Sequence, residues 1–96
     1  MLIDKGVTEG EVITLKLTSG EELVAKLAQE ADSYYKLAKP MVVGMSPKGP
    51  ALMPYLFTVN PDKEIKLFKT TVTVVEPTDP DFAKQFIEST SGIKLV

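Results

Sequence analysis

Apolar and polar side chains alternate along two neighbouring stretches near the start of the chain, residues 11–18 and 22–28. The apolar positions are Ile13, Leu15 and Leu17, then Leu23, Ala25 and Leu27. A period of two is typical of a half-buried β-strand, and Gly20 between the stretches supplies the backbone freedom of a tight turn. The pattern therefore predicts a β-hairpin.

The middle of the chain is rich in strand-forming residues, but prolines interrupt it. Strand character is expected over 34–45, 51–59, 65–68 and 71–75, with a loop at 46–50 and a turn at 60–63. Pro40 has no N–H for a strand ladder, so it predicts an edge, a bulge or a bend at that point, and Pro54 limits the pairing of its own strand.

The C-terminal part of the chain changes from a period of two to a helical pattern. Asp79 is a typical capping residue, Pro80 suits the first helical position, and Asp81 adds acid to the first turn. One helical face carries Phe82, Phe86 and Ile87. We therefore expect a helix over about 80–90 that docks on the sheet or on a neighbouring subunit.

These elements together predict an all-β fold, because no helix is expected between the strands. We expect one domain over 1–96, made of a small antiparallel barrel at about 11–76 followed by the short C-terminal helix. With 96 residues and no cysteine, the chain has a small core and no disulfide. Association with further copies is then the obvious source of extra buried area.

The composition also bears on location. Residues 1–6 have no basic flank followed by a long apolar run, so we expect no signal peptide. No apolar stretch approaches the roughly 20 residues of a membrane span, so we expect a cytoplasmic protein without a membrane partner.

The residue types disfavour catalysis. The chain has no histidine and no cysteine, which are the commonest general base, nucleophile and transition-metal ligands. The carboxylates Glu21 and Glu22 are accounted for by a hairpin turn, and Asp79 and Asp81 by the start of the helix, so none of the four calls for a catalytic role. Phosphate-binding and dinucleotide-binding glycine motifs do not occur. We expect no enzyme, no catalytic residue, no cofactor and no metal, and a hydrolase that uses carboxylates is the weakest hypothesis.

Two polar segments are candidates for binding. The first is Asp32–Leu37, a polar turn that opens into two tyrosines beside Lys36, and the second is Lys69 in a turn before the last strand. Each segment also has a purely structural explanation. The first can be a capped turn with one tyrosine packed in the core, and Lys69 can be an ordinary solvated lysine. All basic residues are lysines and the net charge is −2, which disfavours a sequence-reading duplex binder but leaves single-stranded nucleic acid open.

The stretch from Val12 to Leu37 resembles the first signature motif of the Sm-like (LSm) family, in the manner of divergent phage-encoded members. The matching positions are Leu15, Leu17, Gly20, Leu27, Asp32, Tyr34, Tyr35 and Leu37. Ala25 stands in place of the usual glycine, and Lys36 in place of an asparagine. The second family motif is similar to Phe68-Lys69-Thr70, where lysine and threonine replace arginine and glycine.

This resemblance implies a five-stranded, strongly bent antiparallel barrel that joins edge to edge into rings, commonly of five to seven copies. It also implies single-stranded RNA binding around the pore. Tyr34 would stack on a base, Lys69 would cover the other face of that base, and Asp32 would shape the turn. Lys36 falls on the base-reading position and cannot accept hydrogen bonds, so weak base selectivity is expected.

Two hypotheses for function stay open at this point. In the first, the ring binds single-stranded, U- or A-rich RNA, which the pairing of Tyr34 with Lys69 favours. In the second, the chain only assembles, for example as a phage structural or host-interaction protein. The net negative charge, the absence of arginine and the presence of Lys36 favour the second hypothesis.

Overall fold

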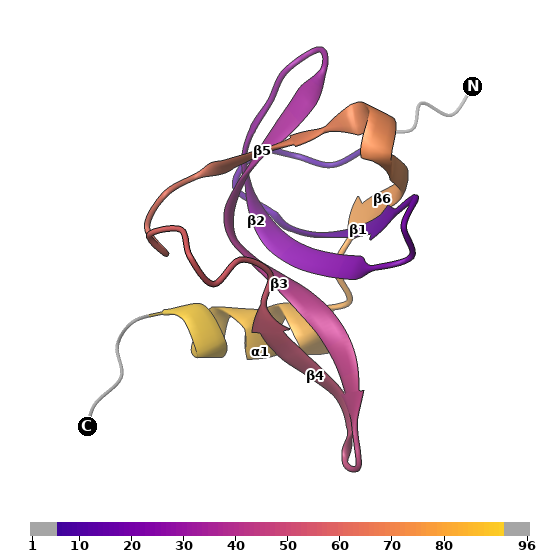
Figure 1. Cartoon of the computed structure of the whole chain (residues 1–96), viewed down its shortest axis with the longest axis vertical. Coiled ribbons are helices and arrows are strands. Elements are labelled where there is room, and N and C mark those ends of the chain that lie inside the picture. Colours follow the sequence, from indigo (N-terminus) through magenta and orange to yellow (C-terminus); the bar gives the residue numbers. More distant parts are fainter. Residues whose placement is uncertain (1–5, 92–96) are drawn as a thin grey trace.

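The computed structural model describes residues 6–91. The first five residues, on which the signal-peptide expectation falls, lie outside the described part, as do the last five. Six strands, one 3₁₀ turn and one helix follow one another along residues 6–91 (Figure 1). They are β1 (Val12–Leu17), β2 (Glu22–Glu30), β3 (Tyr34–Ser46), β4 (Gly49–Pro54), β5 (Ile65–Phe68), η1 (Lys69–Thr71), β6 (Val72–Pro77) and α1 (Pro80–Thr90).

All strand pairs are antiparallel and belong to one bent sheet. The order is β4–β3–β2–β1–β6, and β5 also pairs with β3. Across residues 6–91 no pairing joins β6 to β4 or β5, so hydrogen bonds do not close this sheet into the expected barrel. Residues 6–91 contain six strands, as many as the strand stretches in the sequence, rather than the five that the Sm-like resemblance implies. The stretch expected over 51–59 ends as a strand at Pro54, and β5 begins at Ile65.

β3 is the longest strand, and its two halves have different neighbours. Tyr34–Leu37 pairs with β5, whereas Met41–Ser46 pairs with β4. Between the halves, β3 has one more residue than β2 opposite it, since Val24 pairs with Met41 and Lys26 pairs with Ala38. Lys39, in this extra stretch, has φ of 52°. This is a β-bulge beside Pro40, one of the three features that the proline predicted.

The predicted hairpin of β1 and β2 supplies most of the core. The buried cluster consists of Ile13, Leu15, Leu17, Leu23, Ala25, Leu27, Tyr35 and Leu37. Leu15 pairs with Leu23 across the two strands, so one face of the hairpin is continuously apolar. The alternation in the sequence therefore marks the buried face correctly.

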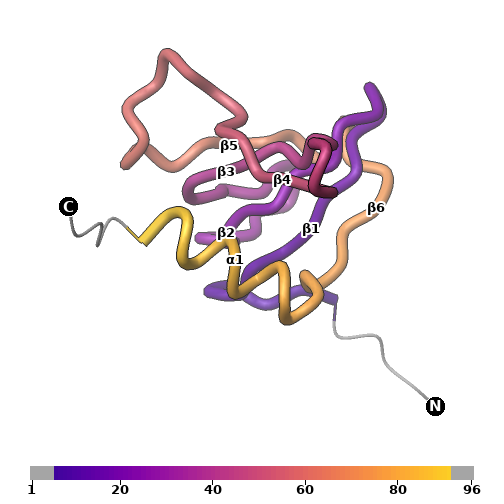
Figure 2. Tube along the Cα trace, turned by 90° about the horizontal axis from the view of Figure 1, so that it is seen from below, coloured from indigo at the N-terminus to yellow at the C-terminus, as the bar shows by residue number. Residues whose placement is uncertain are grey.

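α1 covers the other face of the sheet, where it crosses β1 and β2 (Figure 2). The Asp79 side chain accepts a hydrogen bond from the Asp81 N–H, which is the expected N-cap. Phe86 is buried at 3% exposure and borders a hollow with Val12 and Lys26, which alternate with core positions. Ile87 is 54% exposed, so only part of the predicted apolar face docks.

Within residues 6–91, no helix is long and apolar enough to cross a membrane. The same part of the chain contains no group of three or more acidic, histidine or cysteine side chains that could hold a metal ion.

Candidate nucleic-acid interface

The pairing of β3 with β5 brings four side chains onto one exposed face of the sheet. Tyr34 lies opposite Phe68, and Lys36 lies opposite Lys66. Directly paired residues share a face, and here the intervening Tyr35 and its partner on β5 point to the core side. We call Tyr34, Lys36, Lys66 and Phe68 the aromatic–lysine platform.

The aromatic pair of the platform joins the exposed Phe68 to the half-buried Tyr34. The ring centroids of Tyr34 and Phe68 are 6.3 Å apart with an angle of 78° between the planes, an edge-to-face contact. Phe68 is 54% exposed, although phenylalanine is usually buried. The Lys66 ammonium lies 5.0 Å from the centroid of the Tyr34 ring, a cation–π contact. Aromatic surface and positive charge therefore occupy the same few ångströms of the protein.

The two lysines of the platform face each other without a compensating charge. Lys36 and Lys66 are direct cross-strand partners, and like charges in that position are destabilising. The two ion pairs of residues 6–91 are Lys39–Asp62 and Lys69–Glu30, and neither involves a platform lysine. A bound anion would relieve this repulsion.

Lys69 lies away from the platform, on the core side of the sheet. Its ammonium is 5.0 Å from the ring centroid of Tyr35 and 2.7 Å from Glu30 Oε2, and its backbone N–H donates to the Ser33 carbonyl. The hydrogen bond to Glu30 raises the pKa of Lys69, and the charge of Asp32 contributes in the same direction. The structure thus gathers Asp32, Lys69 and Glu30 at one end of the sheet.

The structure brings only some of the expected site residues together. Tyr34 and Lys69 were expected to cover two faces of one base, but Lys66 and Phe68 contact Tyr34 while Lys69 lies over Tyr35. The physical reason is the alternation of side chains along β3, which sends Tyr34 and Tyr35 to opposite faces. Tyr34 and Lys36 do share a face, whereas Asp32 lies in the exposed turn that precedes β3.

Sequence reasoning missed Lys66 and Phe68. Their alternation with the partly buried Ile65 and Leu67 was visible in the sequence and indicated an exposed pair. Their partners depend on the register between β3 and β5, which joins residues about 30 positions apart and has no local signal.

Charge is unevenly distributed along the chain. Residues 31–71, which contain the platform, hold six lysines and three acidic residues, whereas residues 6–30 hold two lysines and five acidic residues. Residues 72–91 hold one lysine and four acidic residues. The negative net charge therefore conceals a basic half of the molecule, built by β3 to β5.

The second half of β3 and β4 form a two-stranded hairpin that projects from the body (Figure 1). We call residues 41–54 the apolar arm, because Lys48 at its tip is its one charged residue. Met45 and Met53 are 79% and 48% exposed. Two-stranded hairpins are marginal alone in water, so this arm exposes apolar surface that an interface would cover.

The outer edge of the apolar arm offers few hydrogen-bond donors. The Tyr55 N–H donates to the Pro40 carbonyl, so it points toward β3. Because successive backbone N–H groups of a strand point to opposite sides, the backbone nitrogens of residues 50, 52 and 54 point away from β3. Two of these three positions are Pro50 and Pro54, which leaves the Leu52 N–H as the one outward donor of β4. The prolines preserve the internal ladder while they block continuous pairing with another strand.

Comparison of the sequence with protein-family models gives no match, and comparison with curated proteins gives none either.

Proposed function

We propose that the chain is an Sm-like module that binds single-stranded RNA with weak base selectivity on the aromatic–lysine platform. The observation that carries this proposal is the facing pair Lys36 and Lys66, which lacks a carboxylate partner and adjoins the partly exposed aromatic pair. Stacking on aromatic rings suits any base, and lysines suit the phosphate backbone, so the platform provides affinity without reading sequence.

Features of the fold support the family resemblance. A single bent antiparallel sheet carries a long third strand, and its last strand returns to pair with the first. The turn at 31–33 and the turn at 69–71 lie at the same end of the sheet, joined by the hydrogen bond from Lys69 to Ser33. Sm-like domains are expected to bring these two turns together, although here the exposed aromatic lies on the opposite face from Lys69.

The proposal is tested by fluorescence anisotropy with labelled oligo-U and oligo-A at two salt concentrations. Lys36→Gln and Lys66→Gln should each weaken binding and flatten the salt dependence, because a lost phosphate contact releases fewer counterions. Lys48→Gln is the matched control, since this exposed lysine sits at the tip of the arm. No binding by the unaltered protein at low salt would refute the proposal.

The aromatic contribution is tested separately. Tyr34→Ala and Phe68→Ala should weaken binding by about 1–3 kcal/mol per stacked base, whereas Tyr34→Phe should be nearly silent because stacking uses the ring. Lys69→Ala should have a smaller effect than Lys66→Gln, since Lys69 is paired with Glu30 on the other side of the sheet. The reverse order would move the site to the turns.

We further propose that copies of the chain assemble into a closed ring of five to seven subunits. The open sheet has two edges, and the acidic β6 and α1 of one copy complement the basic half of the next. The prolines of β4 restrict strand pairing, so side-chain packing by the apolar arm would carry the contact. Light scattering should give the mass of a ring, and a monomer at micromolar concentration would contradict it.

A second candidate function is assembly without RNA binding, as in a structural or host-interaction protein of a phage. The exposure of Met45 and Met53 on the arm favours it, since an apolar hairpin serves contact between proteins and does nothing for RNA. A ring that fails to bind either oligonucleotide at low salt would support this second function.

A further inference from the structure

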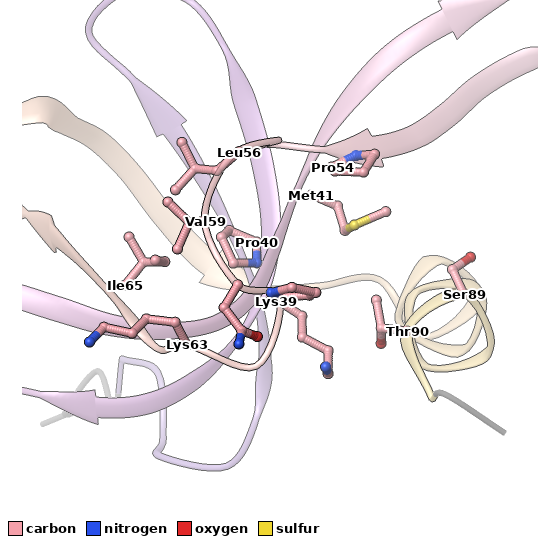
Figure 3. A pocket seen from close by; sticks show the side chains of 12 residues that line it. Lys39, Pro40, Met41, Pro54, Leu56, Val59, Lys63, Ile65, Ser89 and Thr90 are labelled. Atoms are coloured by element: carbon pink, nitrogen blue, oxygen red, sulfur yellow. The ribbon is translucent and has the colours of Figure 1, made fainter.

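A pocket of about 300 Å³ lies between the loop 55–64, the bulge of β3 and the last turn of α1 (Figure 3). Its apolar lining comes from β3, β4, the loop and β5, and consists of Pro40, Met41, Pro54, Leu56, Val59 and Ile65. The helix contributes the polar residues Ser89 and Thr90. None of the four platform residues lines it. This volume is at the lower end of the range for small-molecule sites.

Much of the pocket wall is rigid. Pro40 and Pro54 lie on neighbouring strands, and Pro61 belongs to a turn in which the Asp62 N–H donates to the Asn60 side chain. Proline has a fixed φ, so these parts of the wall have less conformational freedom to lose when a ligand binds. Met41 supplies a flexible thioether that can adapt to the shape of an apolar ligand.

A lysine stands at the rim where its backbone conformation is unfavourable. Lys39 has φ of 52°, a region that favours glycine or asparagine, and it precedes a proline, which favours extended backbone. Strained residues of this kind cluster at ligand sites. The one acidic partner of Lys39 within residues 6–91 is Asp62, at 3.3 Å and 88% exposed, so water competes strongly for this pair.

The charge and polarity of the pocket lining indicate which class of ligand it suits. An apolar interior with Lys39 and Lys63 among its lining residues suits a molecule that has an apolar body and one anionic end. We propose that this pocket binds a short unbranched alkyl carboxylate, with its chain against the proline and aliphatic walls and its carboxylate paired with the Lys39 ammonium. The carboxylate would take the place of Asp62 beside Lys39.

The test is a calorimetric titration of the full chain with octanoate. Saturable binding is expected, and hexanoate should bind more weakly by about fourfold for each methylene removed, the factor that 0.8 kcal/mol per buried methylene gives. Octyltrimethylammonium has the same tail and the opposite charge, so it should bind far more weakly. Absence of saturation, or equal affinity for the cation, would overturn the proposal.

Two pairs of variants locate the site. Lys39→Met should weaken octanoate binding by about tenfold or more, because it removes a charged hydrogen bond, whereas Lys48→Met on the arm should not. Leu56→Ser should also weaken binding, whereas Phe57→Ser, a neighbouring residue that is 80% exposed and does not line the pocket, should not. Equal losses in a variant and its control would overturn the assignment to this pocket.

Discussion

The two halves of β3 behave as two different strands, although the chain runs through both without a break. In the first half, Tyr35 and Leu37 are buried between β2 and β5, and Tyr34 and Lys36 face outward. In the second half, from Met41 to Ser46, no residue is buried. Both halves are paired on two sides at their start, but only the first contributes fully buried side chains to the core, whereas Val42 in the second half packs against the core partly buried.

The difference teaches that pairing alone does not bury a strand. The sequence of the second half is the more apolar of the two, yet its side chains are partly exposed because no second layer covers the apolar arm. The first half carries Lys36 and one tyrosine, Tyr34, on its outer face and still contributes to the core through alternation. Function is accordingly expected of both: ligand contact in the first half, and contact between proteins in the second.

The largest expected difference in stability is between alanine substitutions in the two halves of β3. Leu37→Ala, at a position that is 1% exposed, should lower the free energy of unfolding by about 4 kcal/mol, as in tightly packed cores. Val43→Ala should cost only about 1 kcal/mol, because its side chain is partly exposed. Urea unfolding at low protein concentration measures both. A similar cost for the two would mean that another copy covers the arm even under those conditions.

The helix offers a second contrast between covered and open apolar surface. Phe86→Ala should lower the free energy of unfolding by about 3 kcal/mol, since Phe86 fills the space between α1 and the outer face of the sheet. Ile87→Ala, at the next and largely exposed position, should change it by less than about 1 kcal/mol. Thermal and urea unfolding compare the two variants. If Phe86→Ala leaves the melting temperature unchanged, the helix is not docked as described.

The bulge between the halves can be relaxed by one substitution. Lys39→Gly should be more stable than Lys39→Ala by about 0.5–1 kcal/mol, because glycine tolerates φ of 52° and the loss of its unfolded-state freedom offsets only part of the gain. Chemical unfolding of the matched pair measures the difference. A more stable alanine variant would show that the positive φ carries no strain.

The smallest effect concerns the ion pair at the end of the first half. Glu30→Gln should lower the pKa of Lys69 toward its ordinary value of 10.5, which NMR of the lysine side chain can follow. Because the folded-state pKa is raised, the contribution of this pair is present at neutral pH and is lost as the pH rises through the folded-state value. Glu64→Gln is the control, because Glu64 is not among the groups that act on Lys69. An unchanged Lys69 pKa in Glu30→Gln would contradict the contact.

The predictions from sequence succeeded where the signal was local. Alternation identified the hairpin and its buried face, and the Asp79-Pro80 start identified a helix whose bounds match α1. The missing N–H of Pro40 indicated an edge, a bulge or a bend, and the structure has a bulge beside it. For the site, the sequence indicated Tyr34, Lys36 and Lys69, but not that Tyr34 and Lys36 share a face, nor that their neighbours are Lys66 and Phe68. The RNA-binding roles of these residues stay predictions.

The sequence by itself thus determined the alternation of the two hairpin strands and the ends of the helix, because each depends on positions within a few residues of one another. Only the tertiary structure decided that Lys36 faces Lys66, that β4 and β5 share β3, and that the loop 55–64 closes a pocket against α1. Those outcomes depend on register and on bending of the sheet at the Lys39 bulge. Register between distant strands is selected by the packing of the whole core, so no short stretch of sequence specifies it.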